Sequence, residues 1–289
     1  MIELLALTSA VFYGTADFCG GITARRANTV ATVFVSQLAG LIMILAVLPF
    51  LPKAVVSTSD WVWGVVAGLS GGIGVAVLYR ALAIGTMAVV APITAVCAAM
   101  IPVLVAFALG ERLQALALLG IILAFVAIVL VSQAPANTEN ESEIHASAKS
   151  RSSAGIGLAL LAGVIVGLFF LSLARTSAAA GMWPLVAARI TSVALFGLFA
   201  LATGRSVRMD KTASGIAVTG GVLDMLANVL FMIAARIGPL SVVVTLASLY
   251  PAGTVILARF VLGERLTRTQ AIGIFCALAA VVVIVSRPG

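Results

Sequence analysis

Asp224 and Asn228 are two polar residues in the middle of a long apolar stretch, residues 213–235. Residues four apart on a helix lie on the same face, so the two side chains point in one direction. An ionisable group inside a lipid bilayer is unfavourable and needs a partner or a function there. The pair therefore predicts a binding site for a polar substrate or a proton. The alternative is a hydrogen bond between two helices.

Arg189 and Gln37 occupy nearly corresponding places in two other apolar stretches, residues 182–203 and 31–51. From these places both side chains can line a central cavity. Arg189 then either holds an anionic group of a substrate, such as a carboxylate, or neutralises Asp224, which is a structural role.

Asp17 and Tyr250 complete the set of candidate site residues. Asp17 lies toward the end of the first apolar stretch, residues 3–22. It is either a gate or coupling residue or a charge at the membrane interface. Tyr250 stands beside Pro251 and either contacts a ligand or packs against other helices. The expected substrate-binding residues are Asp224, Asn228, Arg189, Gln37 and Tyr250, and the expected gate or coupling residues are Asp17 and Asp224.

Residue patterns for metal chemistry are absent from the sequence. The only histidine, His145, lies in the most polar segment, so no HExxH motif exists. The cysteines Cys19, Cys97 and Cys276 lie in apolar stretches and form no CxxC pair. We expect no catalytic residue, no metal and no cofactor.

The candidate residues are embedded in a very apolar chain. Hydrophobic residues make up 62% of its 289 residues and charged residues 9%, whereas a soluble domain is about half apolar and a quarter charged. Lipid is the solvent that suits such a surface, so we expect an integral membrane protein. The formal charge of +7 comes from scattered basic residues, which favours anionic lipid headgroups over nucleic acid as partners.

Ten apolar stretches are long enough to cross a bilayer as helices, which need about 20 residues each. The expected helices cover residues 3–22, 31–51, 61–83, 88–109, 114–131, 155–174, 182–203, 213–235, 240–261 and 268–285. Pro102 and Pro251 fall inside two of them and predict kinks. The GxxxG spacing from Gly68 to Gly72 predicts close contact between helices.

A polar segment, Ser132–Ser153, divides the chain near its middle and is expected to be a flexible linker. The parts on either side repeat one another when the sequence is shifted by 153 positions. Leu109–Leu113 then aligns with Leu262–Leu266, and several glycines also align. We therefore expect two five-helix repeats, residues 1–132 and 155–289, joined by residues 133–154.

An odd number of helices in each repeat has a geometric consequence. The second repeat must enter the membrane from the opposite side, so the halves are related by a pseudo-two-fold axis in the membrane plane. Such halves can exchange conformations, one state opening inward and the other outward. The sequence thus predicts an all-α integral membrane protein of ten transmembrane helices in two inverted five-helix repeats, and it favours transport.

The aligned pentapeptides share the motif Leu-Gly-Glu-Arg, at Leu109–Arg112 and Leu262–Arg265, and a glycine follows each at the same distance. Together with Ser248–Pro251, this pattern resembles the EamA family of the drug/metabolite transporter superfamily over nearly the whole chain. The first half departs from it in having Ala98 where the second half has Pro251. The resemblance implies a ten-helix carrier of small metabolites or drugs with both termini in the cytoplasm. We expect the Glu-Arg pairs of the motifs to tie helix ends together.

The distribution of charge conflicts with this orientation. More Lys and Arg residues fall on the side opposite the termini, so the positive-inside rule places the termini outside. We adopt the orientation that the resemblance implies, in the plasma membrane, and expect a bacterial inner membrane.

The leading hypothesis is a secondary transporter, expected to be an exporter, that moves small metabolites or drugs by alternating access. It is either coupled to protons or exchanges a counter-substrate. A flippase for lipids or lipid-linked sugars is the alternative within transport. A membrane-embedded enzyme and a non-transporting membrane partner are the alternatives outside it. The expected partners are the substrate, protons or a counter-substrate, and membrane lipids, with the chain acting as a monomer or homodimer.

Overall fold

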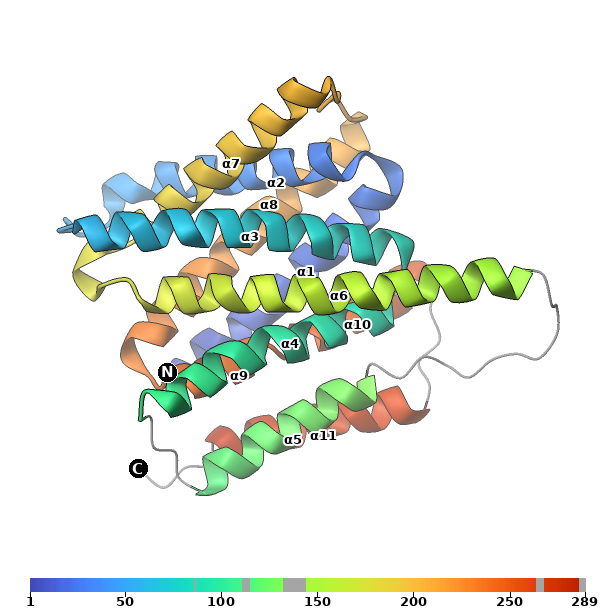
Figure 1. Ribbon diagram of the computed structural model, residues 1–289. Helices are drawn as coiled ribbons and strands as arrows, with labels where there is room; N and C mark the ends of the chain where they lie inside the picture. Colours follow the sequence, from blue (N-terminus) through green and yellow to red (C-terminus); the bar gives the residue numbers. More distant parts are fainter. Residues whose placement is uncertain (86, 111–114, 132–143, 264–267, 286–289) are drawn as a thin grey trace.

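The computed structural model describes residues 1–85, 87–110, 115–131, 144–263 and 268–285, and within these ranges every regular element is a helix. The helices form an elongated bundle (Figure 1). Those of the first half are α1 (Ile2–Arg26), α2 (Thr29–Val47), α3 (Thr58–Ile84), α4 (Met87–Ala108) and α5 (Ala115–Val131). Those of the second half are α6 (Ile144–Ala174), α7 (Trp183–Thr203), α8 (Lys211–Ile237), α9 (Leu240–Ala247), α10 (Tyr250–Leu262) and α11 (Arg268–Val285). The short 3₁₀ helices are η1 (Leu48–Phe50) and η2 (Ala178–Ala180).

The predicted stretch 240–261 is divided into α9 and α10. Ser248 and Leu249 separate the two helices, and Pro251 lies in the first turn of α10. Proline has no backbone N–H, so it cannot donate to the turn before it and is tolerated where a helix begins. α4, in contrast, is one helix through Pro102.

The linker predicted over Ser132–Ser153, with its boundary at residue 154, is too long at its C-terminal end. α6 begins at Ile144, so the last ten residues of the predicted linker are helical. The polar residues of this segment keep it out of the bilayer interior, but the segment also contains Ala, Lys and Arg, which are good helix formers. The rest of the predicted linker, residues 132–143, lies outside the described residues.

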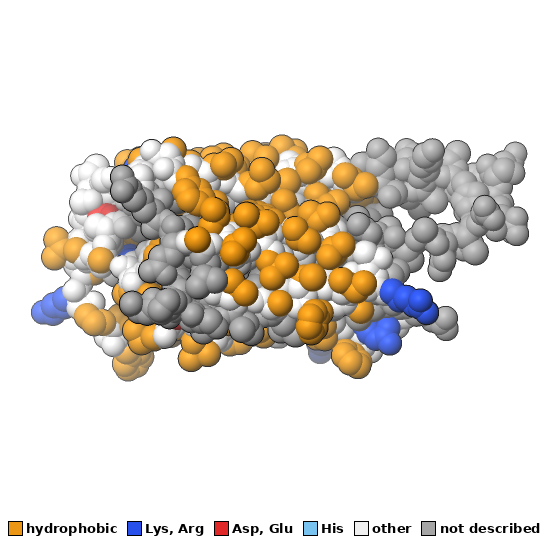
Figure 2. Space-filling view, turned by 90° about the horizontal axis from the view of Figure 1, so that it is seen from below, with side chains coloured by type: hydrophobic (Ala, Val, Ile, Leu, Met, Phe, Trp, Pro, Cys, Tyr) orange, Lys and Arg blue, Asp and Glu red, His pale blue; other side chains and the backbone are white. Residues whose placement is uncertain are grey.

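The surface of the bundle suits lipid. Apolar side chains cover the middle of the face seen in Figure 2, and Lys and Arg side chains lie toward its ends. Large side chains such as Leu4, Leu104 and Leu198 are more than half exposed. Within the described ranges, seven helical segments are long and apolar enough to cross a membrane: 2–26, 29–50, 58–84, 155–174, 183–203, 211–237 and 240–262. The chain is therefore a multi-pass membrane protein, and the count of ten spans stays a prediction.

Close backbone contacts hold six helices around a common centre. α1 packs along α8 and α3 along α6, while α2 and α3 both pack against α7 (Figure 1). A Cβ atom on Gly68 would lie 2.5 Å from the Ala188 carbonyl oxygen of α7, and one on Gly221 would lie 2.1 Å from the Ser36 carbonyl oxygen of α2. Only glycine fits at such distances, which confirms the close helix contact predicted at Gly68.

Candidate functional site

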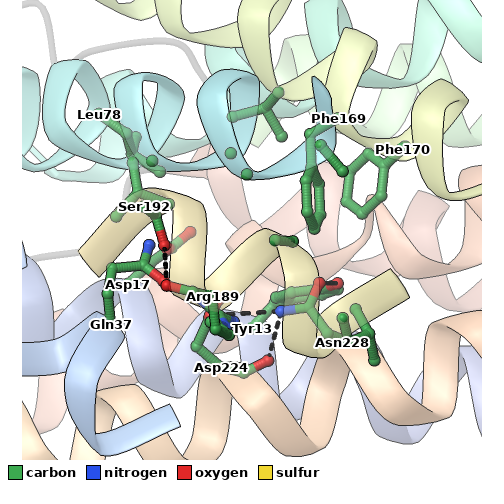
Figure 3. A pocket seen from close by; sticks show the side chains of 18 of the residues that line it. Tyr13, Asp17, Gln37, Leu78, Phe169, Phe170, Arg189, Ser192, Asp224 and Asn228 are labelled. Atoms are coloured by element: carbon green, nitrogen blue, oxygen red, sulfur yellow. Dashed lines mark hydrogen bonds and ion pairs between the residues drawn. The ribbon is translucent and has the colours of Figure 1, made fainter. Parts of the chain in front are cut away.

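A cavity lies at the centre of the bundle, lined by residues of seven helices (Figure 3). The cavity and its mouth contain about 620 Å³ of space that atoms do not fill. All six candidate residues from the sequence line it. The lining consists of Tyr13, Asp17, Gln37, Ala67, Gly68, Gly71, Gly72, Val75, Leu78, Val166, Phe169, Phe170, Leu185, Ala188, Arg189, Ser192, Asp224, Asn228 and Tyr250.

Arg189 of α7 is the centre of a polar network in the cavity wall. Its guanidinium group donates hydrogen bonds to the Asp224 carboxylate of α8 and to the side-chain carbonyl of Gln37 in α2. Its Nε also lies 3.4 Å from the Met225 Sδ. Arg189 and Gln37 are buried, and the Asp224 side chain is 15% exposed. Of the two roles predicted for Arg189, neutralising Asp224 is the one present in this conformation.

Asn228 extends the network to α1. Its amide nitrogen donates to the Asp224 Oδ2 at 3.2 Å and to the Asp224 backbone carbonyl at 2.7 Å. Its amide oxygen accepts a hydrogen bond from the Tyr13 hydroxyl at 2.9 Å. Polar side chains from α1, α2, α7 and α8 are thus joined in one chain of hydrogen bonds.

The local packing explains why these side chains meet. Gly221 brings α8 against α2 one turn before Asp224, next to the segment that carries Gln37. A Cβ atom on Gly40 would lie 3.3 Å from the Arg189 Nε, so the glycine leaves room for the guanidinium group. The Ser9 hydroxyl donates to the Ala227 carbonyl at 2.9 Å and fixes α1 beside Asn228.

Asp17 and Tyr250 lie in the cavity wall without joining this network. Asp17 is 8% exposed and lies in the wall rather than at the end of the bundle. The Tyr250 ring packs edge-on against the Tyr13 ring, with 6.3 Å between the ring centroids. The structure therefore brings all six predicted residues together, while their role in binding stays a prediction.

The cavity wall also contains residues that were not predicted from the sequence: Tyr13, Ser192 and the aromatic pair Phe169 and Phe170. Tyr13 precedes Asp17 by four residues and Ser192 follows Arg189 by three, so helical spacing places both on a candidate face. Phe169 and Phe170 carry no such signal, because aromatic residues in an apolar stretch are typical of ordinary packing.

Two other sequence features are the segment Gly68–Gly72 and the Glu-Arg pairs of the repeated motif. Gly68–Gly72 has the GxSxG spacing of a hydrolase nucleophile, but it lies inside the continuous helix α3 rather than at a strand-to-helix turn. Its Ser70 hydroxyl donates to the Val66 carbonyl of the same helix at 2.7 Å. The motif pairs Glu111–Arg112 and Glu264–Arg265, expected to tie helix ends together, lie outside the described residues.

Comparison with protein families gives a match over most of the sequence. The model of the EamA-like transporter family matches residues 1–133 and 153–286. The chain belongs to the EamA-like transporter family. This membership is consistent with the drug/metabolite transporter superfamily and confirms the family resemblance.

The fold also resembles a solved crystal structure. The two chains share 18% sequence identity and superpose with a TM-score of 0.70 over 98% of this chain and 95% of the other. At this identity the likeness concerns the fold alone. A comparison with curated proteins found no match.

Proposed function

We propose that this EamA-family protein is a secondary transporter that moves small metabolites or drugs across the plasma membrane by alternating access, in the direction of export. The observation that carries the proposal is the polar network from Gln37 through Arg189, Asp224 and Asn228 to Tyr13, inside a cavity at the centre of a membrane bundle. Buried polar groups at such a depth are typical of substrate or ion sites in transporters.

The relation between the two halves supports an inverted-repeat architecture for this transporter. Eight lining residues form four pairs 153 positions apart: Tyr13 and Val166, Asp17 and Phe170, Gly71 and Asp224, and Val75 and Asn228. The helix packing follows the same repeat. α1 packs on α8 just as α6 packs on α3. In the same way, α2 packs on α8 just as α7 packs on α3. Both halves therefore contribute equivalent faces to one cavity, as rocking of one half against the other requires.

The network offers a means of coupling. Gln37 and Tyr13 belong to the first half, and Arg189, Asp224 and Asn228 belong to the second, so the hydrogen bonds tie the halves together. A proton on Asp224 removes its charge and weakens the pair with Arg189. A ligand group that replaces either partner has the same effect. We propose Asp224 as the coupling residue, and the four other network residues as contacts that respond to it.

The test is transport by the purified full chain in proteoliposomes, with a pH-sensitive dye inside and a screen of amino acids, small organic acids and cationic drugs. Loading substrate on one side at a time gives the direction. We expect a substrate-dependent proton signal that Asp224→Asn abolishes. The matched control is Asp210→Asn, because Asp210 is an exposed cap of α8 and asparagine caps helices equally well. Transport that is unchanged in Asp224→Asn would remove that residue from coupling, and silence across the screen would contradict the proposal.

A further inference from the structure

The charges in the cavity wall do not balance. Among the residues that the structure describes, three charged ones line it: Asp17, Arg189 and Asp224. Arg189 and Asp224 form an ion pair, and Gln37 and Asn228 add hydrogen bonds to its two members. One carboxylate, that of Asp17, is left over, so the wall carries an excess of one negative charge when its groups are ionised.

Asp17 is a buried acid without a partner in the part of the chain that the structure describes. Its residue is 8% exposed, it faces the cavity (Figure 3), and no hydrogen bond or ion pair joins it to another described residue. The Asp224 carboxylate, a charge of the same sign, repels it. An unpaired carboxylate away from water is strongly unfavourable, and either a proton on the carboxyl group or a cation bound in the cavity removes that penalty.

Aromatic rings line the same cavity as this carboxylate. Tyr13 lies one helical turn before Asp17, and its ring centroid is 5.8 Å from that of Phe170 and 6.3 Å from that of Tyr250. Phe169 packs on Phe170 with 5.5 Å between centroids. The Tyr13 hydroxyl is already bound to Asn228, which holds the ring in place. Aromatic faces attract ammonium groups, and they do so most strongly where water is excluded.

The remaining wall is small and uncharged. α3 contributes Ala67, Gly68, Gly71 and Gly72, which are small and carry no charge, and Gly71 packs against the Phe169 ring. An apolar ligand body matches these apolar surroundings.

We propose that the ligand of this cavity is a small organic cation, an amine or quaternary ammonium with an apolar body, whose positive group pairs with Asp17 beside the aromatic rings. The inference rests on the proposed function, because it names the substrate class of the same cavity. A neutral ligand leaves Asp17 unpaired. An anionic ligand must displace Asp224 from Arg189 and approach a second carboxylate.

The first test compares three probes that share one aromatic body and differ in charge: benzyltrimethylammonium, benzyl alcohol and benzoate. Radiolabelled benzyltrimethylammonium is bound to the purified full chain in nanodiscs by equilibrium dialysis, and the other two compete. Its charge is permanent, so its protonation does not vary. We expect saturable binding of the cation, with benzyl alcohol and benzoate competing at least tenfold more weakly. Absent saturable binding, or equal affinity across the series, would overturn the inference without any variant.

The second test assigns the binding to Asp17. Asp17→Asn should lower the affinity for the cation at least tenfold, Asp17→Glu should restore part of it, and Asp210→Asn should leave it unchanged. Unchanged affinity in Asp17→Asn would overturn the inference. The two proposals can fail separately. If a substrate is transported in proteoliposomes but binding shows no preference for the cation, only the inference about the ligand is contradicted. If the cation binds in a manner that depends on Asp17 but nothing in the screen is transported, only the transport function is contradicted.

Discussion

Arg189 is the residue on which the polar network depends, because it binds both Asp224 and Gln37. Removing its side chain leaves the Asp224 carboxylate buried without a cation. We expect Arg189→Ala to lower the free energy of unfolding by about 3 kcal/mol. The double variant Arg189→Ala/Asp224→Ala removes both members of the ion pair, so its loss should be clearly smaller than the sum of the two single losses. Denaturant unfolding of the purified protein in mixed micelles measures all three.

The matched control for this cycle is Arg205→Ala, since Arg205 is exposed between α7 and α8. It should change the free energy of unfolding by no more than about 0.5 kcal/mol. Strictly additive losses for Arg189 and Asp224 would mean that the two residues do not stabilise one another.

Tyr13 connects α1 to the network through a single hydrogen bond, 2.9 Å from its hydroxyl to the Asn228 amide oxygen. Tyr13→Phe removes this bond and keeps the ring. We expect a loss of about 1 kcal/mol in the free energy of unfolding, together with a several-fold rise in the KM of transport. Tyr79→Phe is the comparison, because Tyr79 is equally buried but does not line the cavity. A comparable rise in KM for Tyr79→Phe would contradict a specific role for Tyr13.

At the residue scale, the sequence predicts the polar half of the cavity better than the aromatic half. Asp224 and Asn228 are recognisable because a carboxylate and an amide four residues apart are rare inside an apolar stretch. The repeat itself does not identify them, since their counterparts 153 positions earlier are Gly71 and Val75. Which of the many Phe and Tyr residues face the cavity depends on how the helices are rotated, and the all-round apolar helices do not reveal that.

At the scale of elements, the contact between α2 and α8 depends on one missing side chain. A Cβ atom on Gly221 would lie 2.1 Å from the Ser36 carbonyl oxygen, so Gly221→Ala must push the helices apart. We expect it to lower the free energy of unfolding by about 1–3 kcal/mol and to reduce transport, because Gln37 and Asp224 are drawn from these two helices.

The control for Gly221→Ala is on the same helix. Nothing lies within 4 Å of the Cβ position of Gly215 in α8, so Gly215→Ala should be neutral or slightly stabilising. Both variants are compared by thermal unfolding in detergent. Equal melting temperatures for the two would refute the close-packing explanation.

The helices could be predicted where a stretch of sequence is both long and apolar, and they were predicted less well elsewhere. The break between α9 and α10 falls three residues before a proline, whereas the equivalent position in α4 is Ala98 and that helix is continuous. The first ten residues of α6 were predicted as linker because they are mostly polar. Polarity indicates that a segment lies outside the bilayer, but it does not exclude a helix. The close contact at Gly68 was predicted from the GxxxG spacing, although its partner on α7 was not, and no such spacing marks Gly221.

At the scale of the whole molecule, the start of α1 and the end of α11 lie toward the same end of the bundle (Figure 1). We expect this end to be cytoplasmic. Alkaline phosphatase fused after Gly289 should then be inactive, whereas an insertion between Gly204 and Arg205, in the connection from α7 to α8, should be active. The reverse pattern would show that the excess of Lys and Arg opposite the termini sets the orientation.

The central claim is that the cavity opens to each side of the membrane in turn, and one labelling measurement tests it most directly. Ser192 lines the cavity and can be replaced by cysteine with little change in volume, after Cys19, Cys97 and Cys276 are changed to alanine. A membrane-impermeant thiol reagent is applied to sealed vesicles of either orientation. We predict that Ser192→Cys reacts in both orientations and that a transported substrate slows both reactions. Reaction from one side only, under every substrate condition, would contradict alternating access.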